Sequence, residues 1–175
     1  MKTILVAVAL AAAATSIAEA RPRPSRGKRF EANKVLGAGI ELGVPTGLTA
    51  KYFLDPSHAL DFGLGEIDYY GNRSGVHLYG DYLWHPVSLV SAEQFELPLY
   101  FGIGARIWNF DDNRIHDSGF AIGARVPVGV SFDFNNVPLD VFVQVTFVVD
   151  VLLGYAPHSL YPDLEGSLGI RYWFE

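Results

Sequence analysis

The chain of 175 residues has no cysteine, and only 18% of its residues are charged. Without cysteine it has neither a disulfide framework nor a thiolate metal site, which excludes the small secreted proteins that disulfides hold together. It also lacks an unbroken apolar run of about 18 residues, the length that a membrane-spanning helix requires. Because 50% of the residues are nonetheless hydrophobic, the apolar content is distributed along the chain. We expect one domain, held by a large core or by closure of a barrel.

The first twenty residues are typical of a secretory signal peptide. Lys2 gives a positive start, residues 4–14 form a short apolar core, and Ala18-Glu19-Ala20 offers a cleavage site. A retained N-terminal anchor is the alternative, but the core is too short for a stop-transfer helix. The predicted organisation is a signal peptide at 1–20, a basic flexible arm at 21–34 and a β-barrel domain at 35–175.

The arm and the body differ in charge. The chain as a whole carries a net charge of -6, yet the arm concentrates five basic residues, which are Arg21, Arg23, Arg26, Lys28 and Arg29. Its prolines and glycine predict an extended, mobile segment. A solvated tail is expected, with contact to anionic lipid headgroups or cell-wall polymer as the alternative. The acidic body and the lack of interleaved aromatics argue against a nucleic-acid partner.

From residue 35 onward, apolar and polar side chains alternate with the period of two that marks β-strands. In the last such segment, Leu164, Leu168 and Ile170 share one face, whereas Glu165 and Arg171 lie on the other. The segment at 139–153 could also be a buried helix, but its polar residues all fall on even positions and β-branched residues dominate. Eight strands are predicted, at 35–44, 48–54, 59–70, 76–84, 96–107, 120–130, 139–153 and 163–174.

The connections between these segments alternate in position. The predicted periplasmic turns are 55–58, 85–94 and 133–138, and the longest of them, 85–94, has room for a short helical turn. The predicted outer loops are 45–47, 70–75, 109–118 and 154–162. Pro127 has no N–H to donate, so we expect a bulge or irregular pairing in its strand.

Eight strands of membrane-spanning length predict an all-β fold, an eight-stranded antiparallel up-and-down transmembrane β-barrel. The polar face is rich in glycine, which suits a narrow interior, and the apolar face then meets lipid. The alternative is a soluble, lipocalin-like ligand-binding barrel with its apolar face inside. The last strand is expected to pair with 36–42. An aromatic girdle is predicted at the periplasmic rim, formed by Tyr52, Tyr82, Trp84, Phe132, Phe134, Tyr172 and Phe174.

The interior of an eight-stranded barrel is only wide enough for side chains, so a wide pore is not expected. Charged side chains inside it need partners. We predict a structural core of two ion-pair layers, with proton or ion conduction as the alternative. Toward the outer half lie Glu41, Arg106, Asp150 and Glu165; toward the periplasmic half lie Lys51, Asp61, Asp81, Asp140 and Arg171; and Arg125 lies between.

On this pattern of strands, residues 35–174 resemble the small eight-stranded outer-membrane barrels, the superfamily of the outer membrane protein A transmembrane domain and outer membrane protein X. The resemblance implies export to the bacterial outer membrane and contact with outer-membrane lipid and lipopolysaccharide. It also implies insertion by the barrel-assembly machinery, which in that family reads a terminal aromatic residue; here Phe174 is followed by Glu175. We expect a monomer with a structural role, or one that meets an unidentified surface ligand through its outer loops.

Catalytic and metal sites are weakly indicated. His116-Asp117-Ser118 matches the His-x-Ser element of the lipid A deacylases, which makes a lipid A-modifying enzyme an alternative. However, no acidic residue follows Ser118 before Asp133, at the opposite end of the strand, so the third member of a triad is missing. The acidic residues at 111–117 lack the spacing and glycine of a calcium loop. His58, His85 and His158 have no metal-ligand spacing. We therefore expect no enzyme, no cofactor and no metal.

Overall fold

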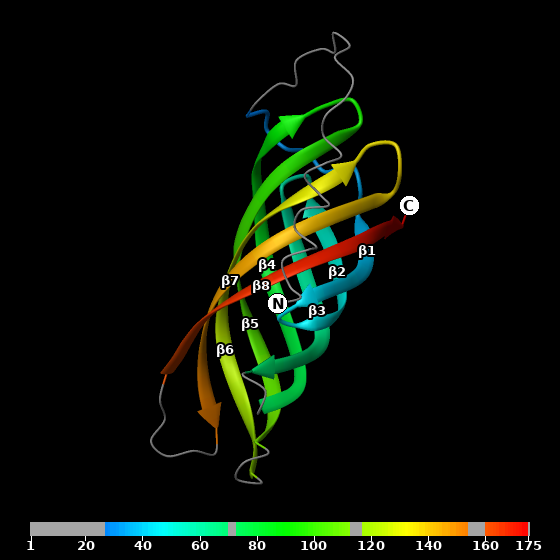
Figure 1. The fold of residues 1–175 in the computed structure, drawn as a ribbon. Helices are drawn as coiled ribbons and strands as arrows, with labels where there is room; N and C mark the ends of the chain where they lie inside the picture. Colours follow the sequence, from blue (N-terminus) through cyan, green and yellow to red (C-terminus); the bar gives the residue numbers. More distant parts are fainter. Residues whose placement is uncertain (1–26, 70–72, 113–116, 154–159, 175) are drawn as a thin grey trace, which may run out of the picture.

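A computed structural model describes residues 27–69, 73–112, 117–153 and 160–174. These residues form eight strands, each hydrogen-bonded to its neighbours in the sequence, and β1 also pairs with β8, so the sheet closes into a barrel (Figure 1). The predicted all-β, eight-stranded antiparallel fold is thus confirmed. The described residues include no helix that is long and apolar enough to span a membrane. The strands are β1 (Leu36–Gly43), β2 (Thr46–Asp55), β3 (His58–Tyr69), β4 (Arg73–Ser91), β5 (Phe95–Asp112), β6 (Asp117–Phe134), β7 (Leu139–Leu153) and β8 (Leu160–Phe174).

The barrel closes where the first strand meets the last. Leu36 lies opposite Phe174 and Gly43 opposite Ser167, with continuous antiparallel pairing between them. The predicted pairing of the last strand with 36–42 is confirmed. A Cβ at Gly39 would overlap the carbonyl oxygen of Ile170, so the seam requires a residue without a side chain at this position.

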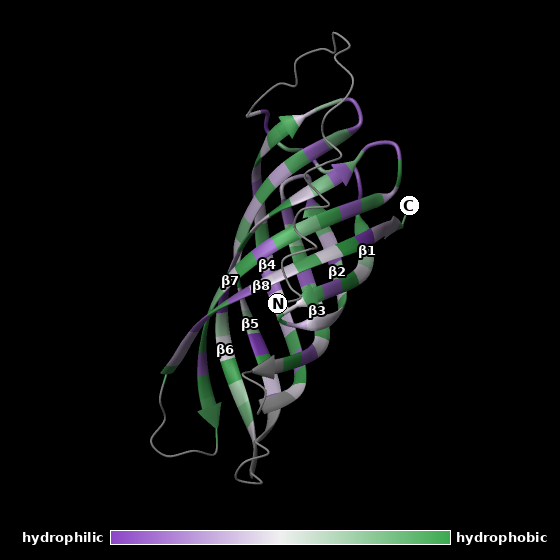
Figure 2. Cartoon of the chain, viewed as in Figure 1, coloured by the Kyte–Doolittle hydropathy of each residue, from purple (hydrophilic) through white to green (hydrophobic). Residues whose placement is uncertain are grey.

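The two faces of the sheet differ in polarity. Along β7, and along β8 from Leu164 onward, successive side chains alternate between exposed or half-buried and buried, and Figure 2 shows the matching alternation of hydrophobic and hydrophilic residues. Large apolar side chains point outward on every strand, and Leu164, for example, is 68% exposed. Charged residues occupy the buried face. The soluble-barrel alternative requires the reverse arrangement, with the apolar face inside.

One end of the barrel carries the short connections 56–57, 92–94 and 135–138, and we call it the turn end. The prediction of a long connection at 85–94 was wrong. Strand β4 continues through Pro86 to Ser91, and no helical turn forms there. Its pairing with β5 shifts register between Trp84 and Val87 and again before Ser91. Such irregularities accommodate a proline that lacks a ladder donor.

Pro127 interrupts a ladder without shifting it. The pairs on either side, Phe101 with Val128 and Gly104 with Arg125, keep one register, and the two intervening positions have no assigned partners between β5 and β6. Pairing of β6 with β7 continues through Pro127 opposite Thr146. The expected irregular pairing is therefore found, and it takes the form of a gap on the side where the missing N–H would point.

The second half of the N-terminal arm, 27–34, crosses the turn end. Ser88 N donates to Lys28 O at 2.8 Å, and Ala32 N donates to Pro56 O at 2.8 Å. Between these points Phe30 is only 2% exposed, with its ring 6.1 Å from that of Phe53. This differs from the expected mobile arm, because burial of one aromatic ring anchors the segment to the barrel. Residues 21–26 lie outside the described part of the chain, and the domain boundaries stay a prediction.

Candidate functional site

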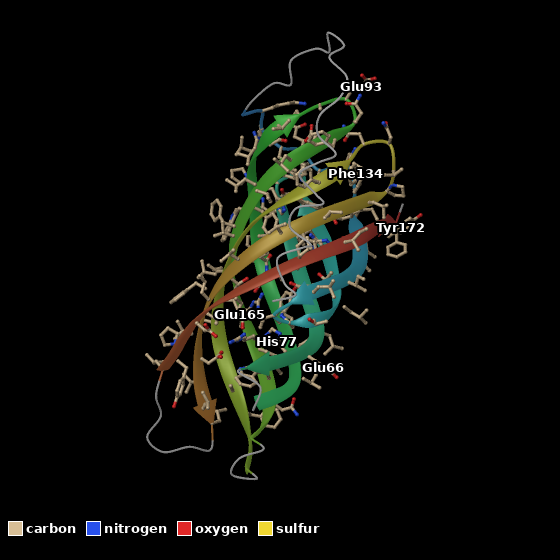
Figure 3. The ribbon with its side chains drawn as sticks, in the orientation of Figure 1. Glu66, His77, Glu93, Phe134, Glu165 and Tyr172 are labelled. Carbon is tan, nitrogen blue, oxygen red and sulfur yellow. The ribbon has the colours of Figure 1, made fainter. Side chains whose placement is uncertain are left out.

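Each of the eight strands sends at least one charged side chain into the barrel interior. The alternation of each strand places these residues on its inward face, and all ten are at most 4% exposed. Figure 3 shows side chains on both faces of the barrel wall and labels Glu165. The ten are the residues that the sequence pattern selected, namely Glu41, Lys51, Asp61, Asp81, Arg106, Arg125, Asp140, Asp150, Glu165 and Arg171.

The Arg106 cluster consists of Arg106, Asp150 and Glu165, on β5, β7 and β8. Arg106 Nε donates to Asp150 Oδ1 at 2.9 Å and its Nη2 to Asp150 Oδ2 at 2.5 Å, so the guanidinium grips this carboxylate with two bonds. Its Nη1 donates to Glu165. Trp108 Nε1 donates to Asp150 at 3.3 Å. These residues were expected in one layer, and the structure brings them together.

Arg125 lies between this cluster and the next. Its Nε donates to Asp81 Oδ1 at 3.1 Å, and its Nη1 is 3.6 Å from Glu165. The guanidinium carbon also lies 4.0 Å from the ring centre of Tyr79, whose hydroxyl donates to Glu41 at 2.7 Å. Glu41 is therefore joined to a tyrosine, whereas the sequence had placed it in an ion-pair layer.

The Arg171 cluster consists of Arg171, Asp61 and Asp140, on β8, β3 and β7. Arg171 Nη1 donates to Asp61 Oδ1 at 2.7 Å and its Nε to Asp140 Oδ1 at 3.2 Å. The guanidinium lies over Phe142 at 4.0 Å from the ring centre. As expected for one layer, the cluster lies toward the turn end, where Asp140 follows directly after the start of β7.

Lys51 makes a different set of contacts from the expected ion pair. Its Nζ lies 3.5 Å from His85 Nε2 and 4.3 Å from the ring centre of Tyr100. None of the ion pairs recorded among the described residues includes it. The alternation of β4 and β5 already placed Tyr79 and Tyr100 inward, but a cation against an aromatic ring depends on the register between strands, which the pattern of one strand does not carry.

Several buried polar atoms have no hydrogen-bond partner among the described residues. Both ring nitrogens of His77 are among them, together with Glu41 Oε1, Tyr100 OH and Gln144 Oε1. His77 is fully buried, with its ring 5.7 Å from that of Tyr79. Uncharged polar groups therefore lie in the interior beside the ion-pair clusters, together with buried apolar side chains such as Leu83 and Phe142.

Aromatic residues mark the turn end of the outer surface. Tyr172 and Phe174 are each 50% exposed, with ring centres 5.3 Å apart, and Tyr82 lies 4.8 Å from Trp84. The predicted girdle residues of β2, β6 and β8 lie within the last four residues of those strands, whereas Tyr82 and Trp84 lie in the middle of β4 (Arg73–Ser91). Tyr52 and Phe132 are also exposed, whereas Tyr82, Trp84 and Phe134 are half-buried.

The catalytic and calcium hypotheses rest on residues outside the described part of the chain, since His116 and Asn113 and the side chains of 111, 112, 117 and 118 are not described. His158 also lies outside it. His58 Nδ1 contacts Asp55 Oδ2 at 2.7 Å, and His85 is buried beside Lys51. Within the described residues no group of three His, Cys, Asp or Glu side chains could hold a metal ion.

Comparison with known proteins bears on the fold. The N-terminal β-barrel domain of OprF from Pseudomonas aeruginosa superimposes with a TM-score of 0.51 at 17% identity, over 79% of this chain and 95% of that one. The chain has the fold of a small outer-membrane barrel. Ail, the attachment invasion locus protein of Yersinia pestis, aligns over 84% of this chain and 100% of its own at 14% identity and a TM-score of 0.37. No protein-family model matches this barrel, and no curated protein sequence is significantly similar to it.

Proposed function

We propose that the protein spans the bacterial outer membrane as a monomeric barrel whose interior is closed by side chains. Its role is structural, or it meets an unidentified surface ligand through its outer loops, and it is not a wide pore. The observation that carries this proposal is the polarity of the wall, with apolar side chains outward on every strand and charged ones buried inside. The partners that follow are outer-membrane lipid, lipopolysaccharide and, during insertion, the barrel-assembly machinery.

An apolar outer surface of this extent favours a lipid environment. Monomeric soluble proteins seldom expose contiguous apolar patches beyond a few hundred Å², whereas here exposed leucine, isoleucine, valine and phenylalanine side chains continue around the whole wall. A closed ring leaves no strand edge, so every strand of the wall can be hydrogen-bonded within lipid. The aromatic residues of the turn end suit the level of the lipid headgroups.

Closure of the interior is supported by side chains that reach across it. Arg106 joins β5 to β7 and β8, and Arg171 joins β8 to β3 and β7. Aromatic rings stack on Arg125 and Arg171. With eight strands, the space inside a barrel is about filled by such side chains. Slow passage of protons or ions is the alternative to a purely structural core. It would use the polar atoms of His77 and its neighbours that have no partner among the described residues.

The test combines cell fractionation with gel migration of heated and unheated samples. We expect the protein in the outer-membrane fraction and a folded form that migrates differently from its boiled form. In planar bilayers the wild-type protein should show no large conductance, and Arg106→Ala should raise it by removing the side chain that spans the interior. A protein that stays folded and soluble without detergent contradicts membrane insertion. A large wild-type conductance contradicts the closed interior.

A further inference from the structure

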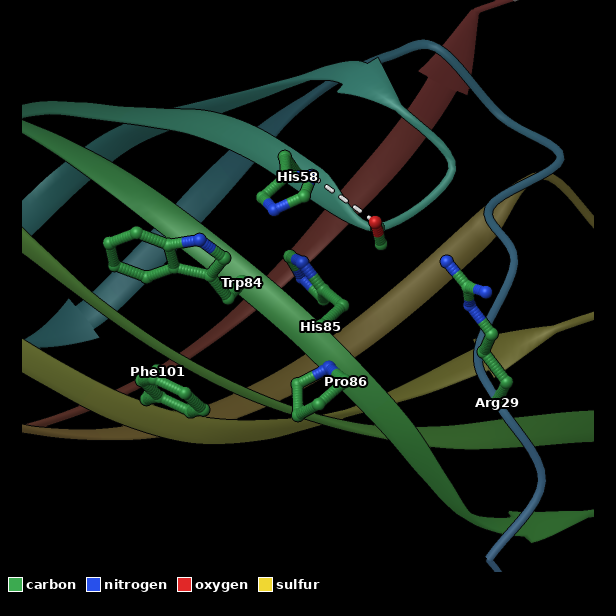
Figure 4. A pocket seen from close by; sticks show the side chains of 7 residues that line it. Arg29, His58, Trp84, His85, Pro86 and Phe101 are labelled. Carbon is green, nitrogen blue, oxygen red and sulfur yellow. Dashed lines mark hydrogen bonds between the residues drawn. The ribbon is translucent and has the colours of Figure 1, made fainter.

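A cleft of about 340 Å³ lies on the outer surface of the turn end, between the barrel wall and the N-terminal arm (Figure 4). Trp84 and Phe101, opposite each other on β4 and β5, form its floor, with ring centres 5.9 Å apart. Ser57 and His58 line one side. Arg29 of the arm faces them from across the cleft. The cleft is therefore lined by four segments of the chain: the arm, the turn that leads into β3, β4 and β5.

We propose that this cleft binds the headgroup of an anionic phospholipid from the leaflet at the turn end. Arg29 holds the phosphate, and the glycerol and upper acyl region lie on Trp84 and Phe101. This inference rests on the proposed insertion in a membrane, and it adds a defined lipid site to it. A planar guanidinium pairs with phosphate through two parallel hydrogen bonds, and aromatic rings with one apolar side suit the boundary between headgroups and acyl chains.

The arm holds Arg29 in place over the cleft. The residue before it, Lys28, accepts a backbone hydrogen bond from Ser88 at 2.8 Å, and the residue after it, Phe30, is buried against Phe53 and His85. Arg29 itself is exposed, and no carboxylate of the described residues pairs with its guanidinium. Since both neighbours are fixed, the backbone that carries Arg29 is held beside the cleft, which lowers the entropy cost of binding.

The floor of the cleft is continuous with the lipid-facing surface. Phe101 is 45% exposed, and Ile103, two positions farther along the same face of β5, is 59% exposed. An acyl chain leaving the cleft would therefore pass directly onto the apolar wall. This continuity favours a lipid over a free phosphate ion, which would gain nothing from the two aromatic rings.

The carboxylate of Asp55 lies beside the cleft residues Ser57 and His58. Its oxygens already accept bonds from Ser57 N at 2.7 Å, Ser57 Oγ at 2.9 Å and His58 N at 3.0 Å, and Oδ2 lies 2.7 Å from His58 Nδ1. The negative charge of Asp55 is therefore already hydrogen-bonded by donors of its own turn. The arm places Lys28 before Arg29 and Glu31 two residues after Arg29, and all three side chains are exposed. The anion is therefore attracted by the Arg29 guanidinium at the cleft and not by an excess of positive charge around it.

The experiment measures quenching of tryptophan fluorescence by brominated lipids in the full-length protein inserted in vesicles. Trp84 lies at the cleft, whereas Trp108 and Trp173 are 4% and 3% exposed in the interior. Equal fractions of brominated phosphatidylglycerol or brominated phosphatidylcholine are compared in a phosphatidylcholine background. We expect phosphatidylglycerol to associate about fivefold more strongly, as one charge-assisted pair at an interface allows.

Three variants separate the site from general surface charge. Arg29→Gln should bring the ratio of the two lipids close to one. Lys28→Gln removes the same charge one residue away and should leave the ratio within about twofold, since screened surface charge contributes little. Phe30→Ala keeps every charge but releases the arm, and it should also lose the preference.

Each contrary result has a distinct meaning. Equal losses in Arg29→Gln and Lys28→Gln, or a wild-type protein that inserts without preferring phosphatidylglycerol, overturn the lipid site and leave the proposed function intact. Loss of the preference on adding inorganic phosphate at constant ionic strength overturns the assignment to a lipid. A wild-type protein that does not insert at all refutes the proposed function together with this inference.

Discussion

Replacing Arg106 with methionine tests whether the interior charges are a stabilising part of the barrel. Methionine keeps most of the length of the side chain but removes the guanidinium, which donates to Asp150 at 2.9 and 2.5 Å and also pairs with Glu165. Two carboxylates then lie in the interior without this cation. Among the described residues, Asp150 keeps only the Trp108 indole, at 3.3 Å.

The expected loss of stability follows from these contacts. Breaking a buried ion pair by removing one partner costs about 3–5 kcal/mol. Glu165 retains Arg125 at 3.6 Å, so we expect the lower end of that range, about 3 kcal/mol. For a urea dependence of about 1–3 kcal/mol/M, the unfolding midpoint then falls by about 1–3 M.

Urea unfolding in lipid vesicles, followed by tryptophan fluorescence and by migration of unheated samples, measures this shift. The matched variant adds Asp150→Asn and Glu165→Gln to Arg106→Met, which removes the unpaired charges and should recover most of the loss. A destabilisation of less than about 1 kcal/mol in the single variant would refute the reasoning, because it is the size of an exposed pair. It would mean that the interior is hydrated enough to screen its charges.

The remaining predictions concern the arm, the seam and one turn. Phe30→Ala should release the arm and speed tryptic cleavage after Arg29 in the folded protein, since burial of the ring contributes about 1.5–3 kcal/mol; mass spectrometry of the digest checks this. Gly39→Ala should block closure of the seam and reduce the folded band on unheated gels, whereas Gly166→Ala, where a Cβ meets nothing within 4 Å, should not. The hydrogen bond from Ser57 N lowers the pKa of Asp55 to about 2 from 3.8, so its stabilising effect is complete above pH 3.8 and is lost as the pH falls through 2; an NMR titration of this carboxyl measures the shift.

Each of these has a contrary outcome. Unchanged cleavage in Phe30→Ala would mean that the backbone bonds alone hold the arm. Equal folding of the Gly39 and Gly166 variants would mean that the seam can open by the width of a methyl group. If the Asp55 carboxyl titrates near its usual pKa, the hydrogen bonds from Ser57 and His58 to this carboxylate do not persist when the protein is in solution.

Strand alternation was enough to predict most of the barrel. In β7 and β8 every charged residue shares one parity, and a slip by one position would have turned Asp150 or Arg171 toward the outer face. The same alternation predicted that the last strand pairs with 36–42, whereas the register, with Leu36 opposite Phe174, comes from the structure. It also selected the buried charges, because a narrow interior and an apolar exterior leave them only one side of the wall.

Other features depend on contacts that one strand does not encode. Pro86 suggested the end of a strand, yet bulged pairing with β5 carries β4 past it. The basic arm has a composition typical of a mobile segment. Its Phe30 nevertheless packs against the ring of His85, whose position depends on the folded barrel. The partners of Lys51 and Glu41 likewise depend on which strands face each other across the interior. That arrangement is set by closure of the barrel and not by the local sequence.

The seam between β1 and β8 also governs how the barrel can form. Ile40 of β1 pairs with Ile170 of β8. The second edge of β1 therefore has no hydrogen-bond partner until β8 is present, and the barrel cannot close before the whole chain has been synthesised. Non-local pairing of this kind makes folding slow, and until closure two apolar strand edges are open to other chains. The topology therefore fixes the order of assembly. The seven pairings between strands that are consecutive in the sequence can form first, and the pairing of β1 with β8 closes the barrel last.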